Sequence, residues 1–452
     1  MVNDGRDPAS ILSLAERALG YAEEAGATGA EALVAADDAR LTRFANSEIH
    51  QNVAESDADI NLRFVVGRRV GVASSNRVDD EGLRRLAETA GAIARNSAEL
   101  EDWGGLPEPT PIKEIPASFA EATANATPEL RAEGVRAVIA AADAVGVISY
   151  GSFSTATEII AVANSMGIRA SQRRTTSQLL TVAMAPDGGS GYAESAAVDV
   201  SSIDAAAIGR EAADKARSTA NPVSVDPGDW PVVLEEYAVV DLLSMLGYMG
   251  FSALAVQEER SFSEPGRRVG SELVTIVDDG MDPATLPMAF DYEGVAKQRV
   301  SLIEEGVCRD VVYDAQTAAR AGRASTGHGL PAPNPYGPFP LNMAMAGGSA
   351  AREELIAGLE RGLLVTRFHY TNPVHPKLAI VTGMTRDGTF LVEAGRIVGP
   401  VRNLRFTQSY LEAMAGTSAV SKERRTLRGD FGGVVVPAIR VDSWTFTGAT
   451  EH

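Results

Sequence analysis

The most constraining feature of this 452-residue chain is an apolar segment near its middle, residues 237–256. Asp241 is its only charged residue, and twenty such residues are long enough to cross a bilayer as a helix. However, the segment contains glycines and serines and is flanked by two glutamates on each side. A membrane span more usually has basic residues on its cytoplasmic flank. We therefore expect a helix at about 236–256 that is buried inside a folded domain.

The charge balance limits the classes of partner. The chain has 41 Lys and Arg against 60 Asp and Glu, which gives a formal net charge of −19. Because phosphate groups are bound by clustered basic side chains, this excess of acid disfavours nucleic acid and anionic membranes as partners. The single cysteine, Cys308, excludes a disulfide framework and a multi-cysteine zinc site. The first residues resemble no secretory signal, so the cytoplasm is the expected compartment.

The hydrophobic period changes repeatedly along the chain, which predicts both helices and strands. Helical spacing is found at 10–25, 80–95, 127–144 and 202–218. Strand-like segments are found at 31–36, 41–45, 59–66, 69–73, 147–152, 158–163, 167–172 and 175–185. Short turns with glycine, such as Gly67 and Arg68, are typical of antiparallel hairpins. The pattern predicts an α+β fold with extensive antiparallel sheet and flanking helices.

Two domains are expected. The first is an α+β domain over 1–222, with a further boundary in the Pro- and Gly-rich stretch near 103–116. The second is a β-rich domain over 223–452 that contains the buried helix at about 236–256. It also contains strands at 378–384, 389–393 and 396–398, and a polar segment over 321–348. A loop of that length in a compact domain is usually functional or disordered.

The histidines do not form a helical zinc motif. Such a motif needs two histidines four residues apart, with a glutamate beside the first to activate water. The five histidines are His50, His328, His369, His375 and His452; no two are four apart and none precedes a glutamate. His369 and His375 could converge with Asp387 or Glu393 across a hairpin. Packing or surface roles are the ordinary interpretation of histidines in such a loop.

Three carboxylates and one loop are the remaining candidates for chemistry. Glu235 and Glu236 precede the apolar helix, where acids favour the positive end of the helix dipole. Asp241 lies within apolar sequence, where an ionised group is costly unless it is paired. A structural hydrogen bond or ion pair is the ordinary role for such a residue, and a catalytic carboxylate is the alternative. The loop 329–342 contains five prolines and could present extended backbone to a peptide or serve as a rigid cover.

Blocks of sequence along nearly the whole chain resemble one protein family. They lie at 42–51, 67–71, 271–280, 291–294, 302–307 and 388–402. The last, Gly-Thr-Phe-Leu-Val-Glu-Ala-Gly-Arg-Ile-Val-Gly-Pro-Val-Arg, is the most specific. Together they resemble the TldD/PmbA family, also described as TldD/TldE metalloproteases or modulators of DNA gyrase.

The resemblance bears directly on zinc. The active branch of that family carries His-Glu-x-x-x-His on the helix that opens its second half, and a cysteine ligand near its carboxyl end. Here Glu235 stands in place of the first histidine and Val240 in place of the second, and only Glu236 matches. Residues 428–433 contain no cysteine. The chain therefore resembles the TldE/PmbA branch, the metal-free partner of a TldD-type subunit.

The resemblance implies a two-domain fold and a heterodimer with a TldD-type catalytic subunit, or a homodimer. It implies zinc in that partner, none in this chain, and peptides or unfolded segments as substrate. No catalytic residue is carried over. The residues we expect to contact an extended peptide are His328, Tyr336, Asn342, His369 and His375. The alternative is a self-sufficient homodimeric metallohydrolase with a rebuilt metal site that uses Glu235, Glu236, Asp241 or His369. A DNA-topology regulator fits the acidic charge poorly.

Overall fold

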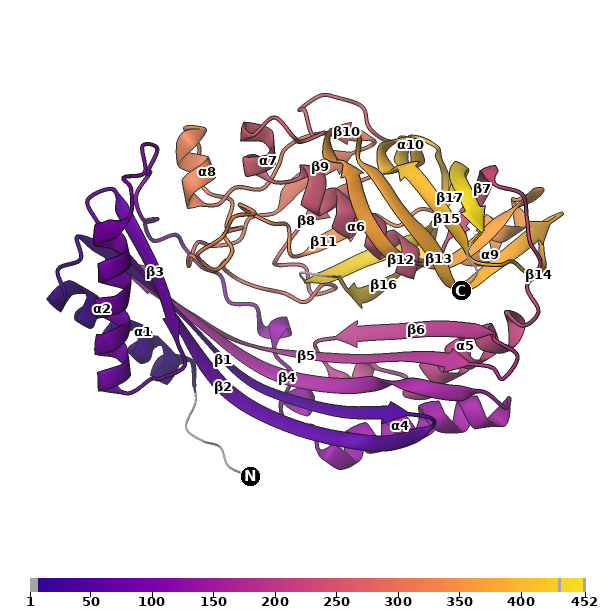
Figure 1. Cartoon of the computed structure of the whole chain (residues 1–452), viewed down its shortest axis with the longest axis horizontal. Helices are drawn as coiled ribbons and strands as arrows, with labels where there is room; N and C mark the ends of the chain where they lie inside the picture. The colour runs from indigo at the N-terminus through magenta and orange to yellow at the C-terminus, as the bar shows by residue number, and fades with distance from the viewer. Residues whose placement is uncertain (1–6, 430–431, 450–452) are drawn as a thin grey trace.

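The computed structural model describes residues 7–429 and 432–449. Within them the chain forms two β-sheets, one from each half, and the second half lies over one face of the first sheet (Figure 1). Strands of the first sheet lie between residues 29 and 197, and those of the second between 228 and 449. The expected α+β fold with extensive antiparallel sheet and flanking helices is confirmed. The division into domains at 222–223, with a further boundary near 103–116, stays a prediction.

The first sheet has six antiparallel strands in the order β3-β2-β1-β4-β5-β6. They are β1 (Gly29–Ala45), β2 (Glu48–Val66), β3 (Arg69–Ser75), β4 (Ile148–Asn164), β5 (Arg169–Met184) and β6 (Ser190–Ala197). The expectation of separate strands at 31–36 and 41–45 is wrong, because β1 runs unbroken through both. Its polar middle keeps its pairing on both sides, with Asp37 opposite Asp57 of β2 and Glu158 of β4. Hydrogen bonds to the two neighbouring strands keep this middle part extended, although its side chains do not alternate between apolar and polar.

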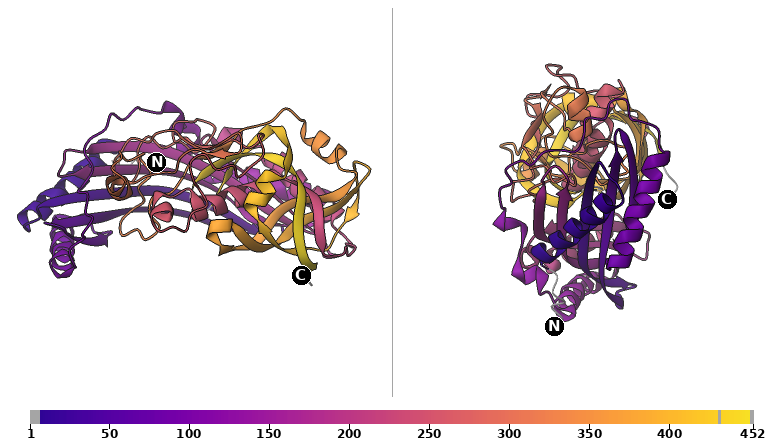
Figure 2. Two further views of the ribbon diagram at one scale, coloured as in Figure 1. Left: turned by 90° about the horizontal axis from the view of Figure 1, so that it is seen from above. Right: turned by 90° about the vertical axis from the view of Figure 1, so that its left-hand side faces the viewer.

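Both faces of the first sheet are covered. Since successive strand residues point to opposite faces, Val34 packs in one apolar cluster with Leu83, and Leu33 packs in another with Phe290 of the second half. Four long helices lie on the first of these faces: α1 (Pro8–Glu24), α2 (Asp80–Asn96), α4 (Pro128–Ala144) and α5 (Ala205–Ser218). Shorter helical turns are η1 (Pro116–Ser118), α3 (Glu121–Ala124) and η2 (Val200–Ser202). The end of the sheet that carries α2 extends past the second sheet (Figures 1 and 2).

The second sheet has eleven strands and is mixed. Its strands are β7 (Gly228–Leu234), β8 (Ile276–Asp278), β9 (Val300–Glu304), β10 (Val307–Cys308), β11 (Met343–Met345), β12 (Arg361–His375), β13 (Ile380–Glu393), β14 (Arg396–Pro400), β15 (Leu404–Ser409), β16 (Thr417–Arg428) and β17 (Gly433–Ala449). The pairs β12–β7 and β11–β17 are parallel. Helices of this half are α6 (Glu236–Gly250), α7 (Ala253–Gln257), α8 (Ala315–Arg320), η3 (Pro376–Leu378), α9 (Arg352–Ala357) and α10 (Tyr410–Ala415).

The apolar segment at 236–256 is buried as expected, but it forms two helices instead of one. α6 ends at Gly250 and α7 begins at Ala253. Between them the backbone pairs with another segment: Val312 N–H donates to the Phe251 carbonyl (2.9 Å), and Ala253 N–H donates to the Val312 carbonyl (3.0 Å). These bonds replace the helical ones, which interrupts the helix. In the part of the chain that the structure describes, no helix is both long enough and apolar enough to cross a membrane.

Candidate functional site

The start of α6 carries the two glutamates that the sequence singles out. Glu235 is the N-cap residue and Glu236 is the first residue of the helix, and their exposed fractions are 5% and 1%. Three basic side chains surround them. Lys215 Nζ lies 2.6 Å from Glu235 Oε2, and Arg352 Nη2 lies 3.0 Å from Glu235 Oε1 and 3.1 Å from Glu236 Oε2. Arg425 Nε is 3.9 Å from Glu236 Oε2.

These cations come from three distant elements, namely α5, α9 and β16. Glu211 joins them, since its carboxylate binds both Lys215 and Arg425 at 2.8 Å. Burial alone would raise the pKa of Glu211, but the charges of Lys215 and Arg425 outweigh it and hold the pKa at about 2. The pKa of Glu235 is lowered in the same way, against burial, by Lys215 and Arg352. The cluster is therefore a closed network of compensated charges.

The residues at this position do not fit a zinc ion. A metal there would have to displace three fixed positive charges from Glu235 and Glu236. Asp241 is also engaged, because it accepts hydrogen bonds from Thr371 Oγ1 (2.6 Å) and Tyr410 Oη (3.0 Å). Across residues 7–429 and 432–449, no three His, Cys, Asp or Glu side chains are grouped so as to hold a metal ion.

A groove of about 570 Å³ opens beside this network, between β6 and the start of α5 on one side and β16 on the other. Tyr237 of α6 contacts two residues that line the groove, Glu194 and Arg425. Its hydroxyl accepts the main-chain N–H of Glu194 (3.2 Å) and a hydrogen bond from Arg425 (2.7 Å). The ring of Tyr192 stands edge-on to that of Tyr237, with ring centroids 5.2 Å apart. A smaller cavity of about 150 Å³ continues along α6 past Asp241.

Two strand edges face this groove. In the described residues, β6 pairs only with β5. β16 pairs with β17, and its first half also pairs with residues 348–350 on the other edge, so that only its last residues, near 424–428, have an unpaired edge. The main-chain N–H of Glu194 donates to the hydroxyl of Tyr237, so it points away from β5. The main-chain N–H of Arg428 donates to Glu194 Oε1 (3.2 Å), so it points away from β17. Main-chain groups alternate between the two edges of a strand. Those of Ala196 and Thr426, each two residues away, therefore also face the groove.

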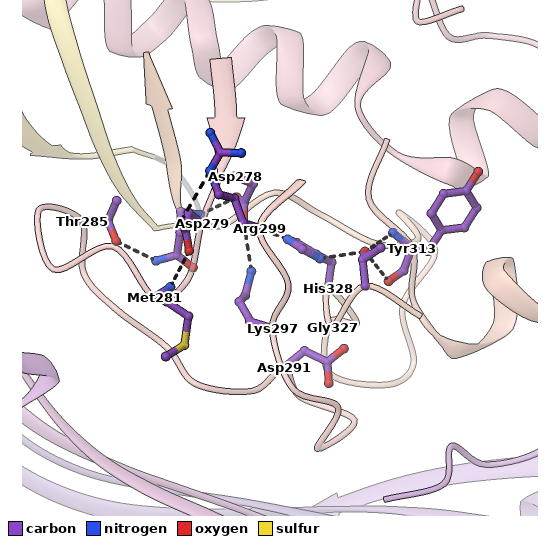
Figure 3. Close-up of polar contacts among 12 residues, drawn as sticks. Asp278, Asp279, Met281, Thr285, Asp291, Lys297, Arg299, Tyr313, Gly327 and His328 are labelled. Atoms are coloured by element: carbon purple, nitrogen blue, oxygen red, sulfur yellow. Dashed lines mark hydrogen bonds and ion pairs between the residues drawn. The ribbon is translucent and has the colours of Figure 1, made fainter. Parts of the chain in front are cut away.

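A second buried network holds the loop at 321–342 (Figure 3). Asp278 Oδ1 lies 2.7 Å from His328 Nε2 and 3.3 Å from Lys297 Nζ, and Asp278 Oδ2 accepts the main-chain N–H of Asn342 (2.7 Å). The other ring nitrogen of His328 lies 2.9 Å from Thr326 Oγ1. Burial and the nearby Lys297 charge lower the pKa of His328, so its imidazole is neutral at pH 7.

The structure does not bring the five expected peptide contacts into one place. His328 and Asn342 are buried in the network just described, and serve to hold the loop. Tyr336 is half exposed, with its ring 6.3 Å from that of Tyr248. On β12, His369 is partly buried and His375 is exposed.

The alternative partners of the two β12 histidines are engaged elsewhere. Asp387 is 2% exposed and accepts a hydrogen bond from Arg367 Nε (2.6 Å). Glu393 lies 3.6 Å from Arg361 Nε. His375 Nδ1 accepts the main-chain N–H of Leu378 (3.3 Å), and burial lowers the pKa of His369 together with the charges of Arg386 and Arg367. His452 lies outside the described residues.

Comparisons with known proteins agree along most of the chain. Models of the PmbA/TldA metallopeptidase match as domain 1 at residues 30–94, as the central domain at 107–219 and as the C-terminal domain at 227–448. An uncharacterized protein of Methanocaldococcus jannaschii is 37% identical over 130 residues, which is 28% of this chain and 31% of that protein. The metalloprotease TldD homolog of Haemophilus influenzae is 28% identical over 265 residues, 54% of each chain. The matches thus span about a third and about half of these relatives.

The fold has a solved counterpart. The crystal structure of TldE from Thermococcus kodakarensis superposes with a TM-score of 0.87, over 96% of this chain and 99% of that one. The two sequences are 22% identical, so this likeness concerns the fold alone.

Proposed function

Because the chain belongs to the PmbA/TldD metallopeptidase family, we propose that it is a TldE/PmbA-like, non-catalytic subunit of a TldD-type zinc metallopeptidase. In this proposal the zinc and the hydrolytic chemistry belong to a TldD-type partner, and this chain completes the complex as a heterodimer. The substrates are peptides and unfolded segments. The names of the Haemophilus relative and of the Thermococcus structure support this pairing.

The observation that carries the proposal is the charge network at the start of α6. Lys215, Arg352 and Arg425 bind the carboxylates at the position where the active branch has its zinc motif. A buried glutamate that is already paired with a cation has little to gain from a metal. Val240, in place of the second histidine, has no atom that can bind one.

Metal content and hydrolysis test this assignment. The purified chain is expected to contain no stoichiometric zinc and to cleave no peptide, whereas its mixture with a subunit that carries His-Glu-x-x-x-His is expected to cleave. The measurements are elemental analysis and a fluorogenic peptide assay, each with the chain alone, the partner alone and the two together. Zinc bound to this chain alone, and lost together with hydrolysis in Glu236→Gln, would instead establish the self-sufficient metallohydrolase.

The proposed contribution of this chain is to hold extended peptide in the groove between β6 and β16. An incoming segment would bond the free main-chain edges at Ala196 and Thr426, which is the mode known as β-strand addition. Main-chain pairing is tolerant of sequence, which suits a protein that handles unfolded segments. The exposed Tyr336 and His375 remain proposed contacts outside the groove.

Two neighbouring alanines of α5 allow this groove to be tested. Ala207 lines the groove and Ala206 does not, although both are partly exposed. We expect Ala207→Trp to weaken the binding of a fluorescent extended peptide by at least about tenfold, because the indole fills the cavity, and Ala206→Trp to leave it unchanged. Methylation of alternate peptide nitrogens should weaken binding similarly, since it removes the N–H donors. Equal binding to both variants and to the methylated peptide would contradict strand addition here.

A further inference from the structure

The groove between β6 and β16 is asymmetric in charge along its length. At one end two cations are present: Glu211 is paired with Arg425 and with Lys215. Glu194, at the same end, accepts the neutral main-chain N–H of Arg428. The other end is lined by Asp199 and Asp204. These two aspartates lie in the segment that connects the end of β6 to the start of α5, and α5 then packs antiparallel to β6.

Asp199 and Asp204 each cap a helical turn. Asp199 Oδ1 accepts the main-chain N–H of Ser201 (2.9 Å), and Asp204 Oδ1 accepts that of Ala207 (2.9 Å). These donors are neutral, so no cationic side chain among them balances the two negative charges. In the described part of the chain, neither aspartate forms an ion pair. Arg425, on the opposite wall, is held by Glu211 and by the hydroxyl of Tyr237.

This end of the groove therefore combines two observations: two carboxylates without an ion-pair partner in the described residues, and the main chain of Ala196, which faces the groove beside them. Resting on the strand addition put forward above, we propose that the groove prefers an extended peptide with a lysine or arginine side chain. The main chain of the peptide lies along β6, and its cationic group binds Asp199 and Asp204. Charge complementarity of this kind chooses among peptides that the main-chain bonds alone would not distinguish.

The cap geometry allows a clean test. Asparagine caps helices as well as aspartate does, so Asp199→Asn with Asp204→Asn removes both charges and keeps both caps. Asp7→Asn is the matched control, because Asp7 caps α1, accepts the N–H of Ser10 (2.8 Å) and lies far from the groove. The probes are short peptides, acetylated and amidated at their ends, that differ only in one central residue: lysine, norleucine or glutamate.

We expect the full chain to bind the lysine peptide about tenfold more tightly than the norleucine peptide at low salt, with the glutamate peptide weakest. The double variant should lose this preference, the Asp7→Asn chain should keep it, and salt should reduce it.

Equal affinities for lysine and norleucine peptides overturn the cation preference but leave strand addition intact. A lysine preference that survives in the double variant overturns the assignment to these two aspartates. A lysine preference that main-chain methylation does not affect overturns strand addition and leaves the cation site. If no peptide binds, both ideas fail.

Discussion

Gly250 shows at the scale of one residue why the apolar segment takes the form it does. It is the last residue of α6, and a Cβ added there would overlap the ring of Phe262, which is fully buried. Phe262 in turn packs edge-on against Phe251, at the break between α6 and α7. The close approach of ring to backbone at this point requires glycine.

We expect Gly250→Ala to lower the free energy of unfolding by about 2–4 kcal/mol, because the ring must move within a packed core. The matched control is Gly20→Ala in α1, where no atom lies within 4 Å of the added Cβ. There the change should be neutral or stabilising by up to about 1 kcal/mol, since alanine favours a helix. Urea unfolding of both variants measures the difference. Equal stabilities would show that Phe262 relaxes without cost.

For Asp241, the structure shows the structural role that the sequence favours for a charged residue in an apolar segment. A lone charge in apolar sequence predicts a structural hydrogen bond or an ion pair, and the carboxylate accepts two hydrogen bonds, from Thr371 and Tyr410. The identity of these donors could not be predicted, because they lie 130 and 169 positions away in the chain. The sequence therefore shows that Asp241 needs polar partners, but only the folded structure shows which residues provide them.

At the scale of elements, helices were more predictable than strands. Helical spacing and cap residues placed α2 and α4 within one residue of their observed ends. The polar middle of β1 predicts a break in the strand, but polar side chains do not end a strand whose backbone is paired with neighbours on both sides.

The candidate site was also predictable only in part from the sequence. Glu235 and Glu236 could be singled out from the sequence because they stand at a helix start beside an apolar run. Lys215, Arg352 and Arg425 could not, because nothing in the sequence around each indicates which carboxylate it meets. Two buried acids predict that cations lie nearby. Which cations these are depends on how α5, α9 and β16 pack around α6.

At the scale of the whole molecule, a cluster of buried carboxylates joins the two halves. Glu31 of β1 and Glu293 of the second half both bind Arg63, at 3.5 Å and 3.1 Å. Asp291 is fully buried nearby and accepts the main-chain N–H of Gly329 (2.7 Å). Burial, followed by the charges of Glu293 and Asp291, raises the pKa of Glu31 to about 8 in spite of Arg63. Burial and Glu293 raise the pKa of Asp291 to about 7.

These pKa values make the junction between the halves weaken as pH rises. In the unfolded chain both groups ionise near pH 4, so between there and pH 7–8 the folded state binds more protons than the unfolded state. Their contribution to stability is therefore complete below about pH 4 and declines as pH rises above that value. It is fully lost once the pH has passed about 7 for Asp291 and about 8 for Glu31. We expect the free energy of unfolding to fall by at least about 1 kcal/mol per pH unit between about pH 5 and pH 7, and to level off above about pH 8.

The test is urea unfolding at a series of pH values. Glu31→Gln should flatten the decline and make the protein more stable than the wild type above about pH 8, because the amide never ionises and has nearly the same volume as the carboxyl group. Glu16→Gln is the control, since Glu16 is about half exposed and pairs with Arg169 on the surface. A wild-type profile that stays level between about pH 5 and pH 8, or one that Glu31→Gln leaves unchanged, would show that this carboxylate is ionised in the folded protein.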